Sequence, residues 1–227
     1  MNFTERILTD QPTDATAIIE RSQAGKRREW SFPAVGQSVM QIAGALHAAG
    51  VRRGDVVMTL IGNRPAWVFA MLAAFRQGYV VLPCNEQLRA KDLRQRLHAV
   101  DIAAIIADPR NRGELERAGI ACPVLWTDEL ENTRSTPPVA GVGLDDPALM
   151  TFTSGTSGQP KCVVHAHRYL WGQRLQGEHW MAVRRGDRVW CTAASGWSKS
   201  ARTASSLPGC AARPRCCTTG ASTPKSG

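Results

Sequence analysis

Short apolar runs alternate with helix-like stretches over residues 38–107 of this 227-residue chain. The runs contain almost no polar residues, which is typical of strands buried on both faces of a parallel sheet. They predict strands at Val56–Ile61, Tyr79–Pro83 and Ile102–Ala107. The stretches around them carry apolar residues at helical spacing, which predicts helices over Ser38–Ala49, Pro65–Gly78 and Lys91–Val100. This alternation predicts an α/β fold with a parallel sheet and flanking helices.

The second part of the chain is organised around a polar loop. Ser, Thr, Pro, Gly and Asp dominate residues 133–147, which predicts a surface linker before the loop. Two strands, Ala148–Thr153 and Lys161–His165, are expected to flank the loop. A helix over Tyr169–Ala182 and a strand over Arg188–Thr192 are expected to follow.

Composition and charge narrow the class of protein. With 43% hydrophobic and 21% charged residues, the chain is typical of a globular protein. Its net charge of +9 suits an anionic small molecule as well as nucleic acid. No nucleic-acid-binding motif accompanies that charge, so nucleic acid is not an expected partner. The longest apolar run, Trp67–Phe75, is less than half of the roughly twenty residues that a membrane span needs.

The N-terminus and the cysteines favour a reducing compartment. The first residues include Glu5 and no apolar core, so no secretory signal is expected. The seven cysteines are odd in number and none forms a C-x-x-C pair, which favours neither disulfides nor a zinc site. A cytoplasmic location is therefore predicted.

His165 and His167 alternate on a strand but have no evident third ligand, so no metal site is assigned. Cys162 is expected to be buried and inert.

The polar loop carries the clearest chemistry. It reads Thr153-Ser154-Gly155-Thr156-Ser157-Gly158-Gln159-Pro160-Lys161, with four hydroxyls, two glycines and one cation in nine residues. Glycines let backbone N–H groups turn toward an anion, hydroxyls donate to phosphate oxygens, and the lysine supplies a positive charge. It is not a Walker A loop, because Pro160 precedes Lys161 and Cys162 follows it. The loop predicts a polyphosphate site, and the alternative is a hydrophilic hairpin turn.

This loop resembles the phosphate-binding motif of the adenylate-forming superfamily, which includes acyl-CoA synthetases, peptide-synthetase adenylation domains and luciferases. Three upstream segments are similar to the N-terminal region of fatty acyl-CoA synthetases: Gly54–Val57, Gly62–Trp67 and Leu82–Asn85. Downstream, Trp190–Thr192 and Gly196–Lys199 are similar to the stretch after the motif in medium-chain acyl-CoA synthetases. That family usually has Asp where this chain has Ala194. The resemblance covers residues 25–201 and implies the N-terminal part of the adenylate-forming fold.

The resemblance implies a two-step ligase reaction. A carboxylic (fatty) acid would attack the α-phosphorus of ATP, releasing pyrophosphate and leaving an acyl-adenylate, and coenzyme A would then take the acyl group. The implied phosphate-binding residues are Thr153, Ser154, Gly155, Thr156, Ser157, Gly158, Pro160 and Lys161, with Mg²⁺ neutralising the pyrophosphate. Trp197 is implied to line the substrate pocket. No catalytic residue can be assigned, because the family's later motifs match nothing in this chain.

Three segments are expected: a lead-in over 1–24, a partial AMP-binding domain over 25–201, and an irregular tail over 202–227. The tail contains no Ile, Val, Met or Phe, and a core element is not expected from it. A suitable choice of synonymous codons allows Leu207–Pro224 to be retranslated in a shifted frame as an apolar stretch. The hypothesis is therefore a one-base frameshift near Arg202, which the coding DNA would test.

Two alternatives to a ligase remain open. The first is a non-catalytic nucleotide-binding or regulatory remnant, which requires the chain to fold alone. The second is a basic nucleic-acid binder, which rests on charge only. The expected partners are a small-molecule carboxylate, ATP and coenzyme A, and the chain is expected to lack the parts needed to complete the reaction.

Overall fold

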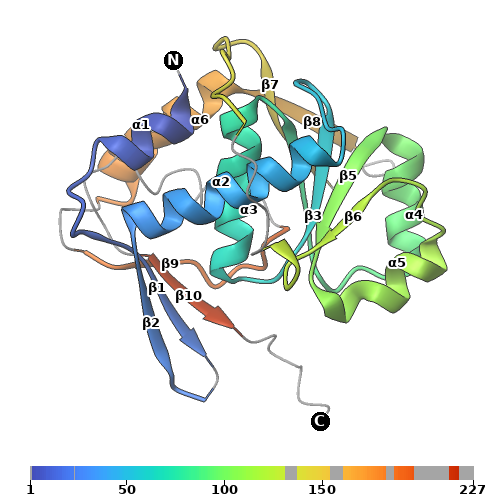
Figure 1. Ribbon diagram of the computed structural model, residues 1–227, viewed down its shortest axis with the longest axis horizontal. Helices are drawn as coiled ribbons and strands as arrows, with labels where there is room; N and C mark the ends of the chain where they lie inside the picture. The colour runs from blue at the N-terminus through green and yellow to red at the C-terminus, as the bar shows by residue number, and fades with distance from the viewer. Residues whose placement is uncertain are drawn as a thin grey trace.

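A computed structural model describes residues 2–22, 24–130, 137–153, 161–182, 187–196 and 215–219. Its centre is a six-stranded sheet in the order β6-β5-β3-β4-β7-β8 (Figure 1). The first five strands of this order run parallel to one another, and only β8 is antiparallel, to β7. The bounds are β3 Val56–Leu60, β4 Val80–Cys84, β5 Ile102–Ala107, β6 Val124–Trp126, β7 Pro147–Thr153 and β8 Lys161–Ala166. The predicted α/β fold with a parallel sheet is confirmed.

Both faces of this sheet are buried at β3, β4 and β5, as the apolar runs predict. Alternate residues of β3 point to opposite faces, so Val57 belongs to one hydrophobic core, and Val56 and Met58 belong to the other. Helices α2 (Phe32–Ala48) and α3 (Pro65–Gln77) pack on the first face. Helices α4 (Ala90–Ala99) and α5 (Arg112–Ala118) pack on the second. Among the described residues, no helix is both long and apolar enough to cross a membrane.

A smaller sheet has the order β2-β1-β10-β9. Its strands are β1 Thr16–Ser22, β2 Arg27–Ser31, β9 Val189–Trp190 and β10 Arg215–Thr219. Residues 1–24, predicted as a lead-in, therefore contain α1 (Phe3–Thr9) and β1. Within the tail expected to be irregular, residues 215–219 form β10, which pairs in parallel with both β1 and β9. Such pairing uses backbone groups and needs no apolar periodicity. The frameshift hypothesis stays a prediction.

Three element boundaries differ most from the sequence pattern. Helix α2 begins six residues before the predicted Ser38, because the Ser31 side chain caps it and Phe32 and Val35 extend its buried face. The helix predicted over 169–182 is α6 (His167–Leu175) followed by a π-helical turn, Gln176–Trp180. The strand predicted over 188–192 shortens to β9.

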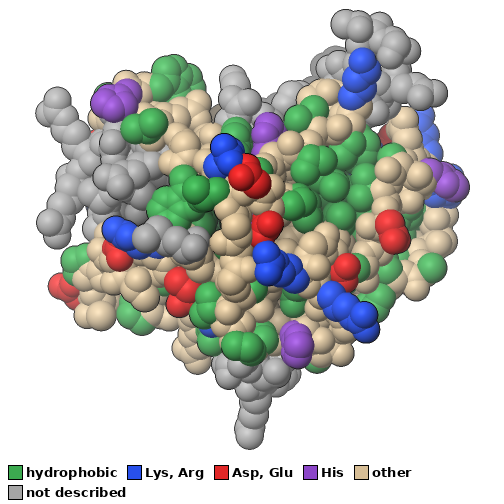
Figure 2. Space-filling view, turned by 90° about the horizontal axis from the view of Figure 1, so that it is seen from above, with side chains coloured by type: hydrophobic (Ala, Val, Ile, Leu, Met, Phe, Trp, Pro, Cys, Tyr) green, Lys and Arg blue, Asp and Glu red, His purple; other side chains and the backbone are tan. Residues whose placement is uncertain are grey.

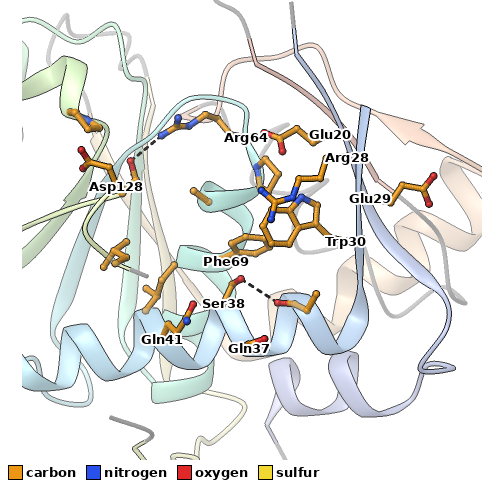
Figure 3. A pocket seen from close by; sticks show the side chains of 17 residues that line it. Glu20, Arg28, Glu29, Trp30, Gln37, Ser38, Gln41, Arg64, Phe69 and Asp128 are labelled. Carbon is orange, nitrogen blue, oxygen red and sulfur yellow. Dashed lines mark hydrogen bonds between the residues drawn. The ribbon is translucent and has the colours of Figure 1, made fainter. Parts of the chain in front are cut away.

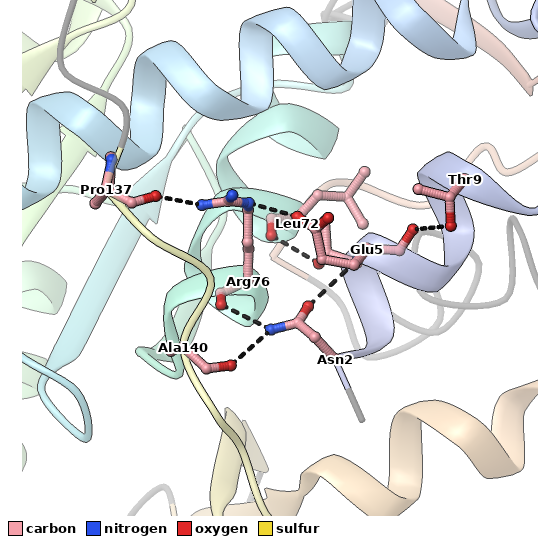
Figure 4. Close-up of polar contacts among 8 residues, drawn as sticks. Asn2, Glu5, Thr9, Leu72, Arg76, Pro137 and Ala140 are labelled. Carbon is pink, nitrogen blue, oxygen red and sulfur yellow. Dashed lines mark hydrogen bonds and ion pairs between the residues drawn. The ribbon is translucent and has the colours of Figure 1, made fainter.

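Helix α3 is fixed at its C-terminal end by a buried arginine (Figure 4). The Arg76 side chain is 5% exposed and lies 2.6 Å from the Glu5 carboxylate, and it donates to the Pro137 carbonyl at 2.9 Å. Asn2 Nδ2 donates to the carbonyls of Arg76 and Ala140 at 2.8 and 3.2 Å. These contacts join α1 and residues 137–140 of the predicted linker to α3.

Strand β8 forms an exposed edge of the large sheet. Val163 and Val164 are 37% and 51% exposed, and Cys162 is exposed as well, so the expected burial of that cysteine is wrong. The reason is that β8 ends the sheet, and within the described ranges no further strand pairs with it. Hydrophobic side chains are visible in patches on the face seen in Figure 2.

Candidate functional site at the carboxyl edge of the sheet

The carboxyl ends of five parallel strands meet at one edge of the large sheet. The chain leaves β3 toward α3 on one face and leaves β4 toward α4 on the other, so the two loops diverge. In open α/β sheets, the crevice at such a switch point is the usual ligand site. Strand β7 also ends at this edge, with Thr153 as its last residue.

The predicted phosphate motif joins β7 to β8 at this edge. Thr153 pairs with Lys161 across the hairpin, and the Thr153 hydroxyl donates to the Lys161 carbonyl at 3.4 Å. The two predicted flanking strands are confirmed. The other predicted phosphate-binding residues lie outside the described residues; these are Ser154, Gly155, Thr156, Ser157, Gly158 and Pro160. Trp197, the predicted pocket residue, lies outside them as well. Their role as phosphate ligands stays a prediction.

A buried carboxylate ties together the ends of β3, β5 and β6. Asp108, which follows β5, is 2% exposed. It accepts hydrogen bonds from the Gly62 backbone at 3.1 Å, from the Thr127 hydroxyl at 3.1 Å and from the Arg64 guanidinium. Arg64 also donates to the Thr127 hydroxyl at 3.0 Å. This network fixes the loop that leads from β3 into α3.

A second carboxylate lies at the end of β4. Burial raises the pKa of the Glu86 carboxyl; Arg110, 3.3 Å away, lowers this pKa, and Asp108 raises it further. Asn111 Nδ2 donates to the Glu86 backbone carbonyl at 2.7 Å. Glu86 packs directly on Gly62, where an added Cβ would overlap the carboxylate and lie 2.8 Å from its Cδ. The β3–α3 and β4–α4 loops are therefore in close contact despite leaving on opposite faces.

Sequence reasoning did not single out Arg64, Glu86 or Asp108. Each is a charged residue within a few positions of the end of a predicted buried strand, and that placement is the signal that would have found them. A polar residue directly after a buried parallel strand lies at the ligand edge of the sheet.

The segment Ala193–Gly196 returns from β9 to this crevice. Asn63 Nδ2 donates to the Ala193 carbonyl at 2.7 Å, and the buried Ser195 hydroxyl donates to the Ile61 carbonyl at 2.5 Å. Ala194, where the resembled family usually has Asp, lies between these two anchored residues. The described part of the chain stops at Gly196, the residue before Trp197.

A cavity of about 660 Å³ opens beside the same edge (Figure 3). Its walls come from the β1–β2 hairpin, from α2, from the start of α3 and from residues 127–130. The Arg28 guanidinium lies 3.8 Å above the Trp30 ring, which makes an edge contact with Phe69 at 5.0 Å. Charged groups of both signs line the rim, including Glu20, Arg64 and Asp128, so the lining does not select a ligand by charge.

The histidines considered as a metal pair contact different neighbours. His165 stacks on Tyr169 with ring centroids 4.2 Å apart, whereas His167 is buried and packs against Phe75. The part of the chain described by the structure contains no group of three or more potential His, Cys, Asp or Glu metal ligands.

Comparison with known proteins identifies the family. The family model of AMP-binding enzymes matches residues 4–207, so the chain belongs to the AMP-binding enzyme family. It is 30% identical over 197 residues to the uncharacterized acyl-CoA ligase YtcI of Bacillus subtilis, covering 81% of this chain and 37% of the relative. It is 31% identical over 197 residues to human mitochondrial acyl-coenzyme A synthetase ACSM5, covering 79% and 34%. The chain thus spans about a third of the length of these curated relatives.

Solved structures share the fold. An acyl-CoA synthetase of Brucella canis superimposes with a TM-score of 0.87 at 21% identity, over 98% of this chain and 44% of that one. ATP-bound MatB of Rhodopseudomonas palustris gives a TM-score of 0.80 at 22% identity, over 95% and 44%. The resemblance drawn from the motif and the expected fold are both confirmed.

Proposed function

We propose that this chain is the phosphate-binding part of an acyl-CoA synthetase-type ligase. The ligase would activate a carboxylic acid with ATP to an acyl-adenylate and then transfer the acyl group to coenzyme A. The supporting observation is the position of the phosphate motif, whose first and last residues flank a hairpin at the carboxyl edge of the sheet. The acyl-CoA ligases among its relatives support the same reaction class.

Each part of the motif has a proposed task. The hydroxyls of Ser154, Thr156 and Ser157 donate to phosphate oxygens, and the Thr153 hydroxyl gives up its long bond to the Lys161 carbonyl to do the same. The backbone at Gly155 and Gly158 turns N–H groups toward the phosphate oxygens. Lys161 fits a phosphate-binding role, because it is exposed and forms no ion pair with a carboxylate of the described residues. Mg²⁺ in such sites is held largely by substrate phosphates and water, and it would neutralise the leaving pyrophosphate.

We further propose that residues 1–227 bind nucleotide without completing the reaction, because the chain spans about a third of its relatives' length. A non-catalytic nucleotide-binding or regulatory role is the second candidate. The observation that favours it is that the phosphate motif and both hydrophobic cores lie within this one chain. A cytoplasmic location stays a prediction, since the relatives include mitochondrial and bacterial proteins.

Titration calorimetry with Mg·ATP on the whole chain tests the proposal. Lys161→Ala removes a charge-assisted contact and is expected to weaken binding about 10- to 100-fold. Lys26→Ala, which removes an exposed lysine from the β1–β2 hairpin, is the matched control and is expected to change the affinity less than twofold. Equal affinity of the two variants would contradict the assignment.

A further inference from the structure

The cavity beside the β1–β2 hairpin is lined by charged side chains that the described residues leave without a counter-ion. These side chains are Glu20, Arg28 and Asp128. The other two charged residues of the lining already have partners. Glu29 pairs with Arg27 at 2.5 Å, and Arg64 pairs with Asp108. The cavity therefore offers two carboxylates and one guanidinium to a ligand.

Two of these charges, of opposite sign, are neighbours on the hairpin. Glu20 of β1 and Arg28 of β2 are partners in the antiparallel register, so their side chains lie on the same face, with Cβ atoms about 5 Å apart. The Arg28 guanidinium lies over the Trp30 ring at 3.8 Å. A guanidinium stacked in this way keeps its in-plane N–H groups available for a carboxylate. The hairpin can thus bind a carboxylate and an ammonium group side by side, with Asp128 on the opposite wall (Figure 3).

The rest of the cavity is largely apolar. Phe69 of α3 and Ile42 of α2 are buried and line it together with Leu130. Trp30 packs against Phe69, and Trp30 Nε1 is buried without a hydrogen-bond partner in the described part of the chain. The volume of about 660 Å³ falls within the range of small-molecule sites, about 300 to 1,000 Å³. This part suits a large apolar side chain, and an aromatic one can make edge contacts with the two rings.

We propose that this cavity binds a free α-amino acid with a large apolar side chain. The α-carboxylate pairs with Arg28, the α-ammonium pairs with Glu20 and Asp128, and the side chain packs on Trp30 and Phe69. An α-amino acid carries both charges on one carbon atom, which suits the close spacing of the Glu20 and Arg28 side chains. The site is separate from the proposed phosphate site, because neither end of the phosphate motif lines the cavity.

Related small molecules test which groups the cavity recognises. L-Phenylalanine carries both charges and a ring, whereas phenethylamine lacks the carboxylate and 3-phenylpropionate lacks the ammonium group. Titration calorimetry on the whole chain is expected to give an affinity for L-phenylalanine about tenfold higher than for either analogue, because each analogue leaves a charged side chain unpaired. Glycine, which lacks the ring, is expected to bind about tenfold more weakly as well. No saturable binding of L-phenylalanine, or equal affinity for the three ring compounds, would overturn the inference.

Variants of neighbouring hairpin residues locate the site. Arg28→Gln and Glu20→Gln each remove a charge that lines the cavity and are expected to weaken L-phenylalanine binding about tenfold. Arg27→Gln is the matched control, because Arg27 is the preceding residue of the same strand and does not line the cavity. It is expected to change the affinity less than about twofold. Equal effects of the Arg27 and Arg28 variants would overturn the inference.

Mg·pyrophosphate separates this cavity from the phosphate motif. At a saturating concentration it is expected to leave the affinity for L-phenylalanine within about twofold, because the two ligands occupy different places. Competition between them would place the amino acid at the phosphate motif and overturn the inference. Hydrogen exchange supplies the location directly: L-phenylalanine is expected to protect peptides of the β1–β2 hairpin and of residues 126–130. Protection confined to other regions would contradict the assignment.

Discussion

The carboxyl edge of the large sheet has two halves that differ in how far the described fold closes them. At the ends of β3, β5 and β6, the closed half, Asp108 is buried and accepts hydrogen bonds from three neighbouring residues. At the end of β7 and the start of β8, the open half, Thr153 and Lys161 are exposed. The sheet thus offers a rigid wall beside an accessible hairpin. A rigid wall can orient a ligand, whereas an accessible hairpin can receive one.

The largest effect is expected from Asp108→Ala in the closed half. It removes the acceptor for Gly62, Arg64 and Thr127 at once, and it leaves a half-buried guanidinium without its carboxylate. Urea unfolding is expected to show a loss of about 3 kcal/mol. Asp145→Ala is the control, because the Asp145 carboxylate is 81% exposed and its pair with Arg168 is a surface pair. Similar losses in both variants would erase the distinction between the halves.

Two valines compare the strands behind the two halves, buried β3 and exposed β8. Val57 of β3 is fully buried, whereas Val164 of β8 is 51% exposed. Val57→Ala leaves a cavity and is expected to cost about 2 kcal/mol of unfolding free energy. Val164→Ala is expected to stay within about 0.5 kcal/mol. A large loss at Val164, measured by the same urea titration, would mean that β8 is covered in solution.

The closed half depends on α3, which is held at both ends. Arg64 joins its N-terminal end to Asp108, and Arg76 joins its last turn to Glu5. Glu5→Gln leaves the buried Arg76 charge without its counter-ion and is expected to cost about 2 kcal/mol by thermal or urea unfolding. Glu129→Gln alters an exposed pair with Arg112 and should change stability by less than about 0.5 kcal/mol. Equal effects would remove the anchoring role given to Arg76.

The smallest effect is expected from pH, through the residue that joins the open half to the core. His167 follows β8, and burial lowers its pKa; Asp146 partly opposes this, whereas Arg53 lowers it further. The unfolded chain then binds the proton more readily, so stability is present above about pH 6.5 and falls as pH decreases below it. Thermal melts from pH 8 to pH 5 should show this loss. His167→Phe should flatten the profile, whereas exposed His179→Gln should not; an unchanged profile in His167→Phe would contradict the assignment.

Sequence patterns predict the strands of the closed half better than they predict the polar contacts made there. Strands β3, β4 and β5 are predictable because residues on both faces are apolar, which leaves continuous runs such as Val56–Ile61. Strands β1, β2 and β6 escape prediction because they lack such runs; β6 has three residues, and β2 is exposed over Arg27–Glu29. Their placement depends on pairing with distant strands.

The residues of the site also differ in how far the sequence predicts them. The motif Thr153–Lys161 is recognisable because its glycines, hydroxyls and lysine are contiguous in sequence. The contacts of Asn63 and Ser195 join residues far apart in the chain, and local pattern carries no signal for them. Asp108 is intermediate. Its position directly after a buried strand can be read from the neighbouring sequence, but its three hydrogen-bond partners lie far from it in the chain.

The most direct test of the central claim is to locate bound pyrophosphate on the intact chain by hydrogen exchange with and without Mg·pyrophosphate. Protection is expected to increase in peptides spanning residues 150–166, at the open half of the carboxyl edge. Protection confined to the basic β1–β2 hairpin around Lys26–Arg28 would contradict it. That result would assign anion binding to surface charge and remove the phosphate role from the motif.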